Sequence, residues 1–80
     1  MAIVHIPRDL THYTGGVEEV IVDAPRVVEL KAALGLRYPG VGPHLDELAV
    51  AIGGEIRNHA DYDVLTADSE IYFVPRLAGG

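Results

Sequence analysis

Short apolar segments separated by turn residues make up most of the hydrophobic pattern of the chain. Residues 2–6 form a nearly continuous apolar run that stops at a proline, which predicts a fully buried strand. Residues 17–23 follow a turn signal at 14–16, and in them Ile21 points away from the valines on either side. The two segments together predict an N-terminal hairpin.

The next segment carries its large apolar residues at helical spacing. Val27, Leu30 and Leu34 recur with the period of an amphipathic helix. Residues 23–25, Asp-Ala-Pro, are typical of a helix start, because aspartate accepts a bond from a free N–H group and proline fits the first turn. Gly35 and the Pro-Gly pair that follows it end the pattern, so we expect a helix of about ten residues.

Proline and glycine interrupt the chain after this helix. Residues 38–45 contain two of each within a short span, which predicts a loop without regular structure. Residues 48–52 alternate large aliphatic side chains with alanine, a pattern that predicts a strand with one large-residue face. The Gly-Gly pair at 53–54 then turns the chain into a short return strand at 55–57.

An irregular connection and one more strand complete the pattern. Within residues 58–68 we expect three side chains to fill the core: Tyr62, Val64 and Leu65. Residues 70–75 alternate between two faces of a strand, which ends at its proline because proline cannot donate to a ladder. The two faces consist of Ile71 with Phe73 and of Tyr72 with Val74.

Composition places the chain among small globular domains. Its 80 residues are 49% hydrophobic and 22% charged, which favours a folded domain and leaves room for one core only. The absence of cysteine excludes disulfides, cysteine-ligated zinc, iron–sulfur clusters and thiolate nucleophiles. The sequence has neither an apolar run of about 18 residues nor an export signal, so we expect a cytoplasmic protein that does not enter the membrane.

The charge of the chain is acidic and unevenly distributed. Twelve acidic residues oppose six basic ones, and the second half alone carries seven acidic and two basic residues. Such a balance disfavours nucleic-acid binding, which depends on clustered lysine and arginine. Two interpretations stay open: a solvated surface that keeps the protein in solution, or an acidic face beside the C-terminus that steers a basic partner.

Candidate catalytic and metal-binding residues form no recognisable constellation. The histidines do not pair at the spacing that puts two metal ligands on one helix face: His5, His12, His44 and His59. Asp61, Asp63 and Asp68 lack the glycine and bidentate glutamate of a calcium loop. Ser69, the only serine, has no predicted base and acid beside it. The residues therefore do not indicate an enzyme.

The chain continues beyond its last predicted strand as Arg76-Leu77-Ala78-Gly79-Gly80. We predict a domain over residues 1–75 and a flexible tail over residues 76–80. Two glycines make the thinnest peptide available, which can pass through a narrow channel and leave the α-carboxylate at its end unhindered. Gly80 would then be the reactive residue, and Gly79 its necessary neighbour, because a Cβ atom there would clash with the channel.

The order of the elements and three segments resemble a known family. The segments are the Tyr38-Pro39-Gly40 loop, the Val50-Ala-Ile-Gly-Gly-Glu55 hairpin and the ending Asp68-Ser-Glu-Ile-Tyr-Phe-Val-Pro-Arg-Leu-Ala-Gly-Gly80. Over nearly the whole chain they are similar to the ubiquitin-like β-grasp sulfur carriers, and most of all to the small subunit of molybdopterin synthase, MoaD. Arg76 stands where that subunit usually has a second proline. The resulting Arg-Leu-x-Gly-Gly ending is closer to that of ubiquitin and of protein modifiers. The cysteine-pathway carrier CysO has a similar Pro-x-x-Ala-Gly-Gly ending.

The resemblance implies a fold and a reaction cycle. The fold would be α+β, a β-grasp with a mixed sheet of four to five strands packed on one main helix. An E1-like adenylyltransferase would use ATP to adenylate Gly80, and a sulfurtransferase or persulfide donor would leave a thiocarboxylate there. The sulfur would then pass to the large subunit of molybdopterin synthase or to another sulfur-accepting enzyme, and the chain itself would bind no cofactor. The alternatives are a carrier for thiamin or cysteine biosynthesis, a modifier joined to lysines through Gly80, and a noncovalent interaction module.

The last strand and the tail are the expected partner-binding surface. Tyr72 and Val74 face away from the side that the helix covers, which leaves an apolar patch leading into the tail. The other residues expected to contact the partner follow directly: Pro75, Arg76, Leu77 and Ala78. Arg76 would meet a carboxylate of the partner. The competing interpretation is that the loop at 38–44 covers Tyr72 and Val74.

Overall fold

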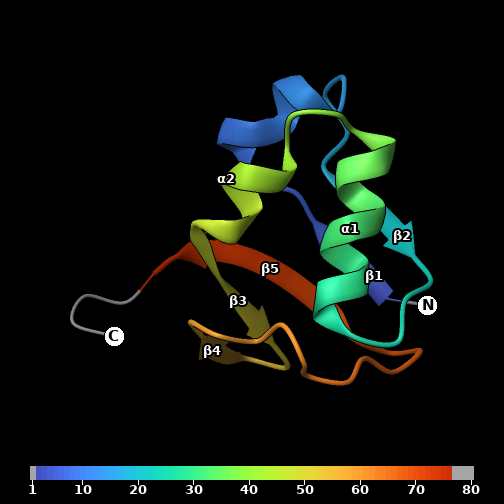
Figure 1. The fold of residues 1–80 in the computed structure, drawn as a ribbon, viewed down its shortest axis with the longest axis vertical. Helices are drawn as coiled ribbons and strands as arrows, with labels where there is room; N and C mark the ends of the chain where they lie inside the picture. Colours follow the sequence, from blue (N-terminus) through green and yellow to red (C-terminus); the bar gives the residue numbers. More distant parts are fainter. Residues whose placement is uncertain (1, 77–80) are drawn as a thin grey trace.

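A mixed five-stranded sheet with the two α-helices on one face organises the chain (Figure 1). The structure is a computed structural model, which describes residues 2–76. The strands are β1 (Ala2–His5), β2 (Glu19–Val22), β3 (Leu48–Ile52), β4 (Glu55–Arg57) and β5 (Glu70–Pro75). The helices are α1 (Val27–Arg37), α2 (Gly42–Asp46) and a 3₁₀ helix, η1 (Arg8–Tyr13).

The strand order is β2-β1-β5-β3-β4, so the first and last strands of the sequence lie side by side in the middle of the sheet. β1 and β5 run parallel, and the other neighbouring pairs are antiparallel. The N-terminal hairpin of β1 and β2 and the hairpin of β3 and β4 are confirmed. The predicted α+β fold, a mixed sheet packed on one main helix, is confirmed as well.

The first strand is only half-buried, which corrects the prediction of a fully buried strand. Ala2 and Val4 point into the core, whereas Ile3 between them is 37% exposed. The physical reason is that the helices cover one face of the sheet and the other face has no second layer among the described residues. The alternation predicted around Ile21 is confirmed, because Val20 and Val22 are buried and Ile21 is 59% exposed.

Helix α1 packs its predicted apolar stripe on the sheet. Val27, Leu30 and Leu34 are all buried in the core. The helix continues through Gly35 and ends at Arg37, two residues before a proline that disfavours helical geometry in the residue preceding it.

The start of α1 differs from the prediction. The cap residue is Arg26, without a side-chain capping bond, rather than Asp23. The free N–H groups of the first turn instead donate to backbone carbonyls: Val27 to Asp63 and Val28 to Asp61. The connection after β4 therefore does the capping that the sequence pattern assigned to Asp23.

The segment at 38–45 is not the irregular loop that we expected, because α2 lies within it. Pro43 occupies the first turn of α2, where its missing N–H group costs no hydrogen bond. Val41 and Leu45 are buried and hold the segment against the core. The segment 38–44 therefore packs on the helix side of the sheet.

The connection between β4 and β5 fills the core differently from the prediction. Leu65 is buried as expected, but Tyr62 is 81% exposed and Val64 is 68% exposed. Ala60 is the small side chain that enters the core in their place. Within residues 2–76, no helix has the length and apolar character needed to cross a membrane.

Candidate functional site at the end of the last strand

Strand β5 ends at Pro75, which is paired with Leu48 of β3, and Arg76 follows it. The proposed reactive residues Gly79 and Gly80 lie outside the described residues, as do Leu77 and Ala78. The division into a domain over 1–75 and a tail over 76–80 likewise stays a prediction. What the structure describes is the surface around Pro75 and Arg76.

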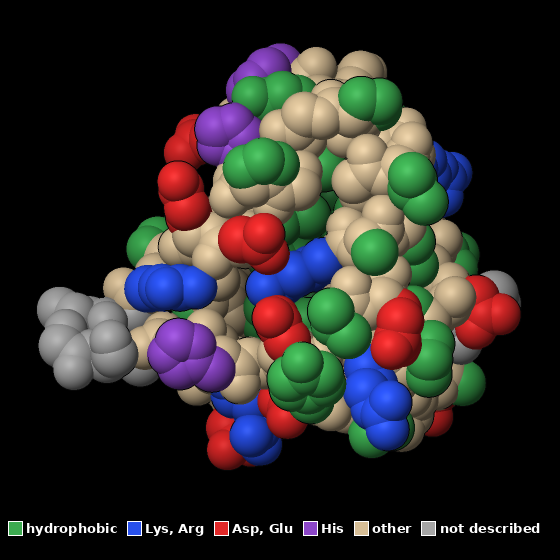
Figure 2. Space-filling model, viewed as in Figure 1, with side chains coloured by type: hydrophobic (Ala, Val, Ile, Leu, Met, Phe, Trp, Pro, Cys, Tyr) green, Lys and Arg blue, Asp and Glu red, His purple; other side chains and the backbone are tan. Residues whose placement is uncertain are grey.

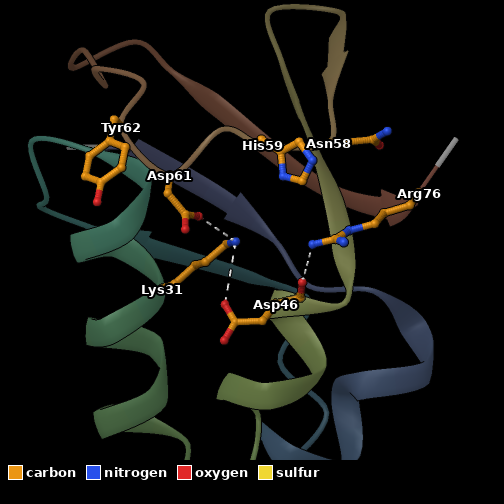
Figure 3. Close-up of a pocket in the computed structure, with 7 residues that line it drawn as sticks. All are labelled: Lys31, Asp46, Asn58, His59, Asp61, Tyr62 and Arg76. Atoms are coloured by element: carbon orange, nitrogen blue, oxygen red, sulfur yellow. Dashed lines mark hydrogen bonds and ion pairs between the residues drawn. The ribbon is translucent and has the colours of Figure 1, made fainter. Parts of the chain in front are cut away.

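A polar cleft of about 370 Å³ lies beside Arg76 (Figure 3). Its lining residues come from α1, α2, the connection after β4 and the end of β5: Lys31, Asp46, Asn58, His59, Asp61, Tyr62 and Arg76. Lys31 lies at its centre, with Nζ 3.0 Å from Oδ1 of Asp61 and 3.7 Å from Oδ1 of Asp46. One ammonium group thus ties three separate segments together.

Arg76 is bound to its own chain. Its Nη2 atom donates a hydrogen bond of 2.7 Å to the backbone carbonyl of Asp46, the last residue of α2. A cation that binds a terminal carbonyl satisfies one of the acceptors that a helix end leaves free. The sequence predicted a partner carboxylate for Arg76, and this contact within the chain was missed. The guanidinium is exposed and keeps further donors for a partner.

A smaller, more apolar cleft of about 220 Å³ is bordered by Pro75. Its apolar lining consists of Pro7, Leu10, Leu48, Phe73 and Pro75, with Asp9, His44 and Glu47 completing it. Pro75 therefore borders an apolar cleft, whereas the next residue, Arg76, borders a polar one. Two clefts of different polarity are thus lined by consecutive residues at the end of β5.

Tyr72 lies on the open face of the sheet, as predicted, and is 46% exposed. The competing interpretation, that the loop at 38–44 covers it, is wrong because that segment packs into the core on the opposite face. Val74 is half-buried on the same face, where its register partner is Ala49. The exposure of Tyr72 suits a partner-binding role, which itself stays a prediction.

His5 forms a side-chain network on this open face that sequence reasoning missed. Its ring stacks on Tyr72 with a centroid separation of 4.0 Å and an interplanar angle of 1°. Its Nε2 atom is 3.0 Å from Oε1 of Glu70, and its Nδ1 atom is 3.5 Å from Oε1 of Glu19. The register between strands distant in sequence creates this network, so no local motif could have shown it.

Four of the seven acidic side chains in the second half are paired with a cation. Lys31 pairs with Asp46 and Asp61, as described above, and Arg57 pairs with two further acids, Glu55 and Asp63. On the helix side, basic side chains are interspersed with acidic ones (Figure 2). Among the described residues, no group of three or more His, Asp or Glu side chains is arranged to hold a metal ion.

No family model and no curated protein matches the sequence. Solved structures do match. A chain of the Amycolatopsis orientalis BexX/CysO complex is 21% identical, with a TM-score of 0.85 over 100% of both chains. Mycobacterium tuberculosis CysO, described as an antigen, is 16% identical with a TM-score of 0.84, over 96% of this chain and 100% of that chain. SAMP1 from Haloferax volcanii is 23% identical with a TM-score of 0.69, over 99% and 98%. These likenesses show that the chain has the ubiquitin-like β-grasp fold.

Proposed function

We propose that this protein is a sulfur carrier of the ubiquitin-like type and that Gly80 is its reactive residue. The observation that carries the proposal is that β5, at the centre of a β-grasp sheet, leads through Pro75 and Arg76 directly to a Gly79-Gly80 ending. The fold that the chain shares with CysO, a member of the carrier group that the ending resembles, supports it.

The proposed chemistry takes place on the Gly80 carboxylate. A carboxylate oxygen attacks the α-phosphorus of ATP within an E1-like adenylyltransferase, and pyrophosphate leaves. The terminal sulfur of a persulfide donor then attacks the acyl carbon and displaces AMP, which gives an acyl disulfide. A thiol reduces the S–S bond of this intermediate and leaves the thiocarboxylate on Gly80.

The chain acts in this cycle as a reagent rather than as a catalyst, and the partner enzymes supply the acid and base groups. It holds no cofactor, because ATP binds to the activating enzyme. Since the activation consumes ATP, we place the protein in the cytoplasm. The surface that meets the partners includes four described residues: Tyr72, Val74, Pro75 and Arg76. Leu77 and Ala78 complete it.

For the sulfur acceptor we propose the large subunit of molybdopterin synthase, in line with the resemblance to MoaD. The similarity to CysO favours a second candidate, an acceptor in cysteine biosynthesis. The BexX/CysO complex is a case in which a protein similar to this chain is assembled with another protein. A third candidate function is that of a protein modifier, which would be conjugated to lysines through Gly80. The arginine at position 76 favours it, because ubiquitin and protein modifiers have a similar ending.

Mass spectrometry of the full chain tests the proposal. Incubation with ATP, sulfide and the E1-like enzyme of the same organism should exchange one oxygen of the C-terminal carboxylate for sulfur. A chain that lacks Gly80 should unfold at the same temperature and form no adenylate, and Gly79→Ala should slow adenylation strongly. Normal adenylation of the shortened chain, or a natural chain that extends beyond Gly80 in the active form, would contradict the proposal.

The same samples separate the carrier from the modifier. A thiocarboxylate or thioester is cleaved by hydroxylamine, whereas an isopeptide bond to lysine survives it. Conjugates that survive hydroxylamine and contain Gly80 would favour the modifier. A noncovalent module would bind its partner equally well without Gly79 and Gly80.

A further inference from the structure

We propose that Asp46 and Asp61 withhold Lys31, the only lysine of the chain, from acylation by an activated Gly80. The activation of Gly80 rests on the proposed function, but the contacts of Lys31 are described independently of it. Three observations carry the inference. The chain has a single lysine side chain, this lysine shares a cleft with Arg76, and its ammonium group is held by carboxylates from two other segments.

An activated carboxyl group and a lysine on the same chain can react with each other. As a neutral amine, Nζ would attack the acyl carbon of the Gly80 adenylate, and AMP would leave with the electron pair of the broken C–O bond. The nitrogen would release a proton to water, and an isopeptide bond between Lys31 and Gly80 would remain. A short tether gives an amine an effective concentration in the millimolar range, so this side reaction would compete with the sulfur donor.

Lys31 lies where residues 77–80 could return to it. Lys31 and Arg76 line the same cleft of about 370 Å³ (Figure 3). Both contact Asp46, Lys31 at the carboxylate and Arg76 at the backbone carbonyl. Four extended residues span about 13 Å, which is enough to lead from Arg76 back into the cleft. An unprotected amine at position 31 would therefore be within range of the activated group.

The Nζ atom of Lys31 is turned toward carboxylates rather than toward solvent. It donates a hydrogen bond of 3.0 Å to Oδ1 of Asp61 and lies 3.7 Å from Oδ1 of Asp46. The lysine side chain is only 13% exposed. Nζ must leave both oxygens before it can attack an acyl carbon.

Backbone contacts hold the two acids opposite Lys31. The carbonyl of Asp61 accepts the N–H group of Val28, three residues before Lys31 in α1, at 2.8 Å. The carbonyl of Asp46 accepts the 2.7 Å bond from Arg76. Among the described residues, no other basic side chain is within ion-pair distance of either carboxylate. The ion pairs of Lys31 are therefore prearranged, unlike a chance contact between long surface side chains.

Acetylation of the folded full chain with acetic anhydride measures the reactivity of Lys31 without any enzyme. The reference is the lysine that Arg37→Lys adds at an exposed position at the end of the same helix. Peptide mass spectrometry gives both rates within one chain, and each is divided by its rate in the urea-unfolded chain. We expect Lys31 to react about fivefold more slowly than the reference lysine.

The double variant Asp46→Asn/Asp61→Asn should raise the rate at Lys31 about fivefold. Its control is Glu47→Gln/Asp68→Asn, which removes two exposed carboxylates outside the ion pairs of Lys31 and should leave the rate unchanged. Asp61→Asn alone removes the shorter contact and should give most of the increase, so the comparison does not depend on the stability of the double variant.

A full chain that carries a Gly80 thioester, prepared by thiol cleavage of an intein fusion, tests the acylation itself without the activating enzyme. The parent thioester should hydrolyse to the acid. The Asp46→Asn/Asp61→Asn thioester should instead form a Gly80–Lys31 isopeptide, which is lighter than the acid by one water. Adding Lys31→Arg to the double variant should abolish this product.

Equal rates for Lys31 and the reference lysine in the folded chain would overturn the inference. A rate at Lys31 that stays low in the Asp46→Asn/Asp61→Asn variant would overturn it as well, because packing of the stem would then give the protection. If Gly80 is adenylated but the double-variant thioester forms no Lys31 linkage, the inference fails and the proposed function stands. If Lys31 is protected by the two acids but Gly80 is never adenylated, the proposed function fails alone.

Discussion

Arg76 donates a hydrogen bond to the backbone carbonyl of Asp46, which joins the first residue after β5 to the last residue of α2. Asp46 in turn contacts Lys31 of α1 through its carboxylate. The root of the tail is thereby connected to both helices as well as to the sheet. The proposed insertion of residues 77–80 into a partner's channel would benefit from a fixed point of departure, because fewer orientations are then sampled before insertion.

We therefore expect Arg76→Gln to lower kcat/KM for adenylation of Gly80 several-fold, with Arg76→Lys retaining part of the parent's value. Pyrophosphate release with the activating enzyme measures this. The free energy of unfolding should change by less than about 1 kcal/mol, since the bond lies at the exposed surface. Identical kcat/KM for parent and Arg76→Gln would show that the contact with Asp46 has no part in activation. Arg76→Glu should in addition raise the dissociation rate, if a partner carboxylate also binds this side chain.

The sequence predicted the strands and the main helix well, because their apolar periods of two and 3.6 are imposed by burial on one face. It failed at α2, where Pro43 signals a break in the chain but fits the first turn of a helix. It failed again at Tyr62 and Val64. The main chain of their neighbours Asp61 and Asp63 is bound to the start of α1, which directs these side chains outward.

Only the part of the candidate site that depends on the alternation of side chains along a strand could be predicted from the sequence. Alternation in β5 placed Tyr72 on the open face, and the structure agrees. The contacts of Arg76 with Asp46 and of His5 with Glu70 join residues 30 and 65 positions apart. Such contacts depend on how the elements pack and on the register of the sheet. No local pattern in a single sequence indicates the packing of distant elements or the register between their strands.

Gly40 should tolerate substitution less well than another glycine with a positive φ angle. A Cβ atom at Gly40, where φ is +98°, would lie 3.0 Å from Cε1 of Tyr13. The Tyr13 hydroxyl is hydrogen-bonded to Nε2 of His44 at 2.8 Å, so the ring cannot swing away freely. We expect Gly40→Ala to cost about 2–3 kcal/mol of unfolding free energy in urea titrations.

Gly15 is the matched control, with φ at +69° and nothing within 4 Å of the added atom. Gly15→Ala should carry the backbone strain alone, about 1 kcal/mol. Equal losses in the two variants would mean that Tyr13 moves aside at no cost.

The two neighbouring aromatic residues of β5 should differ strongly in how much stability their truncation costs. Phe73 is 6% exposed and belongs to the core, so Phe73→Ala should cost about 3–5 kcal/mol of unfolding free energy. Tyr72→Ala loses the stack on His5 but leaves no buried cavity, and about 1 kcal/mol is expected. The same Tyr72→Ala variant should weaken binding of the activating enzyme by more than about 1 kcal/mol. A stability loss in Tyr72→Ala as large as that in Phe73→Ala would identify Tyr72 as a core residue.

Lys31 stabilises the polar cleft through charge, and salt should reveal it. The side chain is 13% exposed and pairs with Asp46 and Asp61, which without it would face each other as two like charges. Lys31→Met keeps the aliphatic stem, so packing is largely preserved and we expect a loss of about 1 kcal/mol at low ionic strength. Salt screens both the attraction in the parent and the repulsion in the variant, because the Debye length falls to about 3 Å at 1 M. The difference between the two unfolding free energies should therefore shrink as the sodium chloride concentration rises.

Arg57→Met is the control, because the Arg57 side chain is 46% exposed between its partners Glu55 and Asp63. Its loss of unfolding free energy should be smaller than that of Lys31→Met. A Lys31→Met deficit that stays constant between low and high salt would assign the stabilising role of Lys31 to packing of its stem rather than to its charge.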